Sequence, residues 1–140
     1  MIIEARYNGP PGTGNGGYCA GRFAAQVSAV DGAVVTLRQP PPLDTELTVE
    51  RTDGTVRILD GGRLVAEAFA APLTAPAVAP VTLPDASAAA RGYAGFADHP
   101  FPTCYVCGPE RHDGLRIFPG PLAEGRTAAP WLVQIGRAHV

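Results

Sequence analysis

The sequence has no lysine, little net charge and no long apolar run. All 11 basic residues are arginine, and 13 acidic residues bring the net charge to −2. This balance provides no basic surface for nucleic acid or for anionic lipid. No apolar stretch approaches the ~20 residues that span a bilayer, and residues 1–6 are too polar for a signal peptide. We therefore expect a cytoplasmic bacterial protein with no nucleic-acid or membrane partner.

Cysteine is also scarce, with only three in the chain, at Cys19, Cys104 and Cys107. In a reducing cytosol these residues are thiols or metal ligands rather than a disulfide framework. Cys104 and Cys107 form a C-x-x-C pair, which can supply two thiolates to zinc. A structural zinc site needs four ligands, and only His99 and His112 lie nearby in the sequence. Packed apolar thiols are therefore favoured, and we expect no metal and no cofactor.

Apolar periodicity organises the first half of the chain. Ile2–Tyr7 is predicted to be an opening strand, and residues 8–17, rich in glycine and proline, a shaped loop. Apolar residues then recur at spacings of three and four, which predicts a largely buried helix over Tyr18–Val30. Asn15 is the expected N-cap of this helix, and Gly32 is suited to its C-terminal end.

After the helix, the apolar period changes to two, which is typical of strands. The primed turns expected at Asp53-Gly54 and Gly61-Gly62 connect neighbouring strands tightly. Together these features predict a four-strand antiparallel meander. Its expected strands are Ala33–Arg38, Thr45–Thr52, Thr55–Leu59 and Arg63–Ala71.

The second half differs in composition. Pro72–Pro102 is rich in alanine and proline, and it predicts a semi-rigid connector with a short helix over Asp85–Arg91 capped by Asp85. Gly114–Phe118 predicts the first strand of a new domain. Residues 135–140, IGRAHV, match what a common sequencing adapter encodes, and we interpret them as an artefact that truncates the chain.

The loop segment Gly12–Gly17 matches the G-x-G-x-x-G pattern. A dinucleotide site would need a parallel strand on each side of the loop and helix, whereas Pro10-Pro11 and the later hairpins disfavour that arrangement. A second interpretation is that bare N–H groups at the helix start polarise a thioester carbonyl. A third is that the glycines only allow the helix to pack closely on a sheet.

Two stretches resemble a known family. The Asn15-Gly16-Gly17-Tyr18 turn that opens the helix is similar to that of tandem-hotdog acyl-CoA thioesterases. Cys104–Pro109 together with Gly114–Phe118 resembles the start of single-hotdog thioesterases. The resemblance implies an α+β hotdog fold, in which an antiparallel sheet wraps around one long central helix, followed by a fragment of a second hotdog. The implied divisions are a hotdog domain at 1–71, a linker at 72–103, a truncated second hotdog at 104–134 and the artefact at 135–140.

The same resemblance implies an acyl-CoA thioesterase-like function in a cleft at the helix N-terminus. Such sites form between two hotdogs, so a homodimer or the missing second hotdog is expected as partner. The predicted helix carries no carboxylate, so hydrolysis is expected only from a full-length protein, and a non-catalytic acyl or acyl-CoA binding module is the alternative. The predicted residues are Asn15, Gly16 and Gly17 for the carbonyl, and Tyr18, Phe23 and Gln26 for the rest of the substrate.

Overall fold

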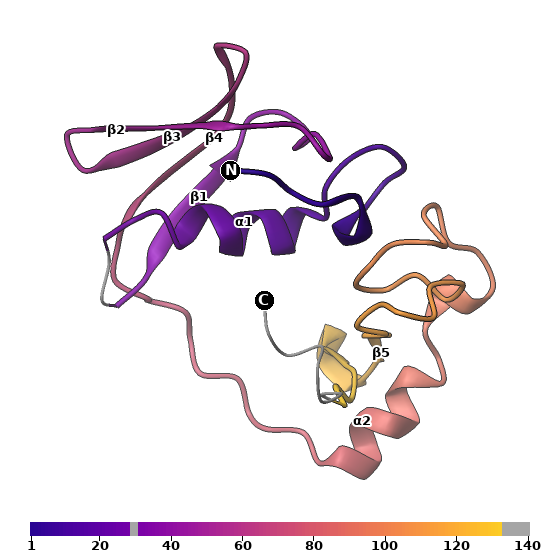
Figure 1. The fold of residues 1–140 in the computed structure, drawn as a ribbon. Coiled ribbons are helices and arrows are strands. Elements are labelled where there is room, and N and C mark those ends of the chain that lie inside the picture. Colours follow the sequence, from indigo (N-terminus) through magenta and orange to yellow (C-terminus); the bar gives the residue numbers. More distant parts are fainter. Residues whose placement is uncertain (29–30, 133–140) are drawn as a thin grey trace. The chain divides into compact units, whose positions relative to one another are not determined.

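The computed structural model describes residues 1–28 and 31–132. These residues form two compact units, the first over Met1–Ala77 and the second from Val78 onward (Figure 1). Each unit is described by itself below. Both helices in the described part of the chain fall short of the length and apolarity that crossing a membrane requires. Residues 135–140, interpreted above as an artefact, lie outside the described residues.

The first unit is built on a four-stranded antiparallel sheet in the order β1-β4-β3-β2. The predicted strands are present, but the prediction of a sequential meander is wrong because β1 pairs with β4. Pro40–Pro42 follow two residues after the end of β1, and proline has no N–H to donate to a ladder, so the chain leaves the sheet before β2. The strands are β1 (Ala33–Leu37), β2 (Thr48–Thr52), β3 (Thr55–Asp60) and β4 (Arg63–Ala70).

Two tight turns join β2, β3 and β4, as predicted. Asp53 and Gly54 have φ of 50° and 78°, and Gly61 and Gly62 have φ of 53° and 88°. Positive φ at both central residues is the type I′ geometry, whose twist matches that of the flanking strands. The two turns predicted from the sequence, and the antiparallel pairing of β2, β3 and β4 that they produce, are therefore confirmed.

The strand registers give the sheet two distinct faces. On the inner face, one cross-strand row contains Val35, Ala68, Val56 and Arg51, and Val56 and Ala68 are buried. The next inner row contains Leu37, Ala66, Ile58 and Val49. The outer face has a charged row, with Glu67, Arg57 and Glu50, beside a row that contains Val34 and Phe69.

Helix α1 (Gly16–Ala24) packs against β1 and β4, and Figure 1 shows it next to β1. Asn15 caps it as predicted, because its Oδ1 accepts a hydrogen bond of 3.0 Å from the N–H of Tyr18. Cys19 and Phe23, four residues apart on one helical face, are completely buried. They join Ile3, Leu47, Ile58 and Val65 in the core.

The predicted helix over Tyr18–Val30 is wrong in length. α1 ends at Ala24, after which Gln26 and Val27 donate to the carbonyls three residues earlier, at 3.0 and 2.9 Å. These are bonds of the 3₁₀ type, which tighten a helix end rather than extend it. Gly32 does not end the helix either, since its carbonyl accepts from the N–H of Ala71 and so continues the pairing of β1 with β4.

The hotdog fold predicted from the resemblance is contradicted. That fold requires a long central helix wrapped by the sheet, whereas α1 has nine residues and is roughly 13 Å long. Apolar spacing alone could not reveal that the backbone leaves the α conformation after Ala25. The predicted strand Ile2–Tyr7 is also absent, and Ala5–Tyr7 forms a 3₁₀ turn, η1. The first unit is an α+β arrangement with one short helix.

The second unit contains α2 (Leu83–Ala90), a 3₁₀ turn η2 (Ala94–Phe96), and a short hairpin of β5 (Gly120–Pro121) and β6 (Thr127–Ala128) around η3 (Ala123–Gly125). The predicted short helix exists, but it starts earlier. Its cap is Thr82, whose Oγ1 accepts from the N–H of Asp85 at 3.2 Å, and not Asp85 itself.

No strand forms over 114–118, where the start of a second hotdog was predicted. Instead, the N–H groups of Leu115 and Ile117 donate to the carbonyls of Tyr105 and Val106, at 2.8 and 2.9 Å. Arg116 between them has φ of 56°, which interrupts an extended conformation. This segment is therefore bound to the loop that contains Cys104 and Cys107, which we call the cysteine loop. Strand propensity does not predict such a contact, because propensity depends on neighbouring residues only.

Candidate functional site

The loop before α1 is held in one shape by close contacts. The N–H of Gly14 donates to the carbonyl of Pro41 at 2.8 Å, and that of Asn15 donates to the carbonyl of Tyr7 at 2.7 Å. A Cβ on Gly14 would lie 2.5 Å from the Sγ of Cys19, so only glycine fits there. The dinucleotide interpretation fails in this unit, because its sheet is antiparallel.

Two backbone N–H groups at the start of α1 have no acceptor in the part of the chain that the structure describes. The first bond within the helix runs from the N–H of Cys19 to the carbonyl of Asn15 at 2.9 Å, and the N–H of Tyr18 is taken by the cap. The N–H groups of Gly16 and Gly17 are left over. Gly16 is half-buried and Gly17 exposed. Such groups, at the positive end of the helix dipole, attract oxygen acceptors.

Apolar and aromatic groups border this turn. The rings of Tyr7 and Tyr18 stack with centroids 3.9 Å apart. The Cδ1 of Leu37 lies 3.6 Å from where a Cβ on Gly16 would be, and Leu37 is 38% exposed. Arg22 donates to the hydroxyl of Tyr18 at 3.3 Å, and burial is the main cause that raises the pKa of Tyr18. The two N–H groups therefore lie beside a surface suited to a carbon chain.

The structure brings together only some of the predicted site residues. Asn15, Gly16, Gly17 and Tyr18 lie together at the start of α1, and we call these four residues the glycine turn. Phe23 is fully buried in the core, so it lines no accessible site. Gln26 lies beyond the far end of α1 and accepts a hydrogen bond from Arg51 at 3.1 Å. The length of the helix, roughly 13 Å, separates Gln26 from the glycine turn.

The glycine turn has no nucleophile or general base from α1. The helix carries no carboxylate. Its single thiol, Cys19, is completely buried, and burial raises its pKa to about 11. A thiol with this pKa is protonated at neutral pH and is a poor nucleophile. The arrangement can bind and polarise a carbonyl, but α1 supplies no group that would attack it.

Sequence reasoning missed a cavity of about 290 Å³ in the first unit. It is lined by residues 26–28, 51–56 and 70, which places it at the far end of α1, against the inner face of the sheet. A signal for it exists in the sequence. Leu47, Val49 and Arg51 alternate along the strand predicted over Thr45–Thr52, so Arg51 occupies a position where the pattern of period two predicts an apolar residue.

The C-x-x-C pair of the second unit is compact. The Sγ atoms of Cys104 and Cys107 are 3.5 Å apart, and Cys104 is buried. Burial and the hydrogen bond with Cys104 raise the pKa of Cys107. The hydroxyl of Tyr93 donates to the carbonyl of Cys107 at 3.3 Å. Within residues 1–28 and 31–132, no group of three or more His, Cys, Asp and Glu side chains is placed to hold a metal ion.

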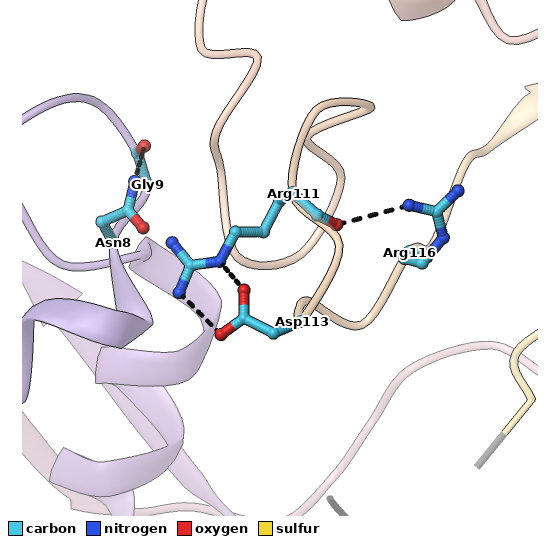
Figure 2. Close-up of polar contacts among 5 residues, drawn as sticks. All are labelled: Asn8, Gly9, Arg111, Asp113 and Arg116. Atoms are coloured by element: carbon cyan, nitrogen blue, oxygen red, sulfur yellow. Dashed lines mark hydrogen bonds and ion pairs between the residues drawn. The ribbon is translucent and has the colours of Figure 1, made fainter. Parts of the chain in front are cut away.

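Polar side chains near the cysteine loop are occupied in local contacts. Figure 2 shows Arg111 in an ion pair with Asp113, and the Nη1 of Arg116 donating to the carbonyl of Arg111 at 3.4 Å. The same figure shows, within the first unit, the Nδ2 of Asn8 donating to the carbonyl of Gly9 at 3.1 Å. These contacts order loops, and none of them joins an acid to a nucleophile.

Comparison with protein-family models, with curated proteins and with solved structures found no match to this chain. Its function therefore has to be inferred from the chemistry of its own residues.

Proposed function

We propose that this chain is a non-catalytic module that binds acyl groups or acyl thioesters at the start of α1. The observation that carries the proposal is the pair of adjacent N–H groups of Gly16 and Gly17, which have no acceptor among the described residues. A carbonyl oxygen can accept from both groups at once, and the helix dipole favours the negative end of the carbonyl there.

The surroundings favour an acyl ligand over a small inorganic anion. Leu37 and the half-buried ring of Tyr18, which stacks on the buried Tyr7, offer apolar contact beside the donors. Burial of a carbon chain on such a surface contributes about 25 cal/mol per Å² of apolar area. The resemblance of the Asn15–Tyr18 turn to that of acyl-CoA thioesterases selects thioesters among carbonyl ligands.

Binding without turnover follows from the absence of reacting groups on α1. Hydrolysis needs a base to activate water or a nucleophile within hydrogen-bond reach of the substrate. α1 carries no acid, and Cys19 is buried with a raised pKa. The three free cysteines agree with a reducing compartment, which we propose is the cytosol.

Replacing Gly16 with proline tests the proposal directly, because proline removes the N–H. Asn15, with φ −60° and ψ 128°, already has the extended conformation that a following proline demands. Proline is also well tolerated at the first helical position. We expect Gly16→Pro to fold normally and to weaken binding of butanoyl-CoA about tenfold, the effect of losing one hydrogen bond of ~1.4 kcal/mol. Isothermal titration calorimetry measures the affinity.

Gly16→Ala is the matched control, since it keeps the N–H and its Cβ makes only ordinary contact with Leu37, at 3.6 Å. It should bind butanoyl-CoA like the wild type. A thiol reagent should detect no release of CoA over hours. Equal affinity of the proline and alanine variants, or equal binding of CoA without an acyl group, would contradict the proposal. Rapid release of CoA would show an enzyme instead.

A further inference from the structure

The cavity at the far end of α1 is lined by one cation, one anion, several polar residues and three apolar residues, Val27, Val56 and Ala70. Its volume, about 290 Å³, lies at the lower limit of small-molecule sites, which begin near 300 Å³. Val56 in its lining is buried and Val27 is half-buried, and Ala70, on the inner face of β4, is exposed. A ligand of a few carbon atoms fits this space, and a nucleotide or a cofactor of similar size does not.

Arg51 supplies the positive charge of the cavity. Of its five N–H donors, one is used by the Oε1 of Gln26 at 3.1 Å. Other arginines of the sheet are ion-paired, as Arg57 is with Glu50 and Arg38 is with Glu67. No carboxylate pairs with Arg51 in the described part of the chain. Asp53 on the hairpin turn also lines the cavity, and no ion pair joins it to Arg51 there.

The position of Arg51 makes this charge unusual. The register places it in one inner row with Val56, Ala68 and Val35, whereas Arg57 alternates onto the outer face. A guanidinium at the rim of an apolar face can bind a carboxylate through two parallel hydrogen bonds, while the hydrocarbon stem of the ligand rests on the apolar residues.

We propose that this cavity binds a small aliphatic monocarboxylate. Its carboxylate pairs with the guanidinium of Arg51, and its short chain lies on Val27, Val56 and Ala70. The site is separate from the glycine turn, so it does not depend on the acyl-binding function proposed above.

Pentanoate is the probe for this site, and pentanamide is its uncharged analogue. In a ligand-detected NMR titration of the full chain, we expect saturable pentanoate binding and at least tenfold weaker pentanamide binding. Arg51→Met keeps the length of the stem and removes the charge, so it should weaken pentanoate binding at least tenfold. Asparagine tolerates the left-handed conformation of position 53. Asp53→Asn should therefore keep the turn and tighten pentanoate binding, because it removes a negative charge from the cavity lining.

Arg57→Met is the matched control, because it removes an arginine from the same sheet on the opposite face. It should leave the pentanoate affinity unchanged, and so should Gly16→Pro, which acts at the other site. The proposal is overturned if wild-type protein does not bind pentanoate, if pentanamide binds equally well, or if Arg51→Met and Arg57→Met have the same effect. Weaker binding by Asp53→Asn would also contradict it.

Discussion

At the scale of the residue, Cys19 shows how burial alters chemistry. Its thiol is withdrawn from water by the core, and its pKa rises to about 11, against about 8.5 for a free thiol. The side chain serves as packing that excludes every residue but glycine from position 14. A cysteine one residue after a glycine-tyrosine pair could be mistaken for a nucleophile, but the surrounding core keeps it protonated.

This burial predicts a pH dependence of stability. Because the pKa of Cys19 is higher in the folded chain than in the unfolded one, folding favours the protonated thiol. That contribution is complete below about pH 8.5 and is lost as the pH rises towards 11. We expect the urea midpoint of unfolding to fall between pH 8.5 and 10.5. In Cys19→Ala, which is less stable at every pH, this fall should be smaller, and an identical fall would contradict the assignment.

At the scale of the element, the sequence predicted features that neighbouring residues determine. The primed turns at Asp53-Gly54 and Gly61-Gly62 and the Asn15 cap were all correct. Features that depend on distant segments were not predictable in the same way. The pairing of β1 with β4 and the attachment of residues 114–118 to the cysteine loop are set by tertiary contacts. The length of α1 also depends on 3₁₀ bonds that apolar spacing does not register.

The residues predicted for the candidate site show the same difference between local and non-local signals. The glycine turn, Asn15 to Tyr18, was predicted because glycines before an apolar helix and an Asn cap are local signals. Phe23 and Gln26 were assigned to the same site by helical periodicity alone. Burial removes Phe23 from any accessible site, and the end of the helix places Gln26 with Arg51 instead.

Replacing a glycine with alanine should lower the stability of the chain at Gly14, in the loop before α1, and raise it at Gly21, within α1. Gly14→Ala puts a methyl group 2.5 Å from the Sγ of Cys19, and such overpacking costs about 1–3 kcal/mol. Gly21→Ala has nothing within 4 Å of the new Cβ, and it should raise stability by about 0.5–1 kcal/mol because alanine loses less backbone entropy in a helix. Urea unfolding monitored by circular dichroism compares the two. Equal effects on the midpoint would show that the contact with Cys19 is absent.

At the scale of the whole molecule, the first unit exposes apolar side chains on its outer face. Val34 and Phe69 lie directly opposite each other on β1 and β4, and they are 43% and 45% exposed. β1 is also an edge strand of the sheet. Adjacent exposed apolar residues at a sheet edge favour association, which supports the expectation of a homodimer.

We expect the chain to dimerise through this face, and we expect Phe69→Thr to weaken that dimer. Threonine suits a strand, and removing a phenylalanine that the dimer buries costs about 1.5–3 kcal/mol of dimer stability, or roughly a tenfold or greater rise in the dimer dissociation constant. Analytical ultracentrifugation across a concentration series measures it. Leu73→Thr, at an 81% exposed position after β4, is the control and should change little. A wild-type chain that stays monomeric throughout the series would rule out the dimer.

The partnership of β1 with β4 also has a consequence for biosynthesis. Leu37 pairs with Ala66, and Ala33 pairs with Ala70, so the first strand to leave the ribosome cannot join its ladder until β4, the last strand of the same sheet, has been translated. The β2–β3 hairpin in between can close as it emerges, since its contacts are local. During that interval β1 has no partner strand from its own sheet, and a ribosome that pauses before codon 70 would prolong this unpaired state.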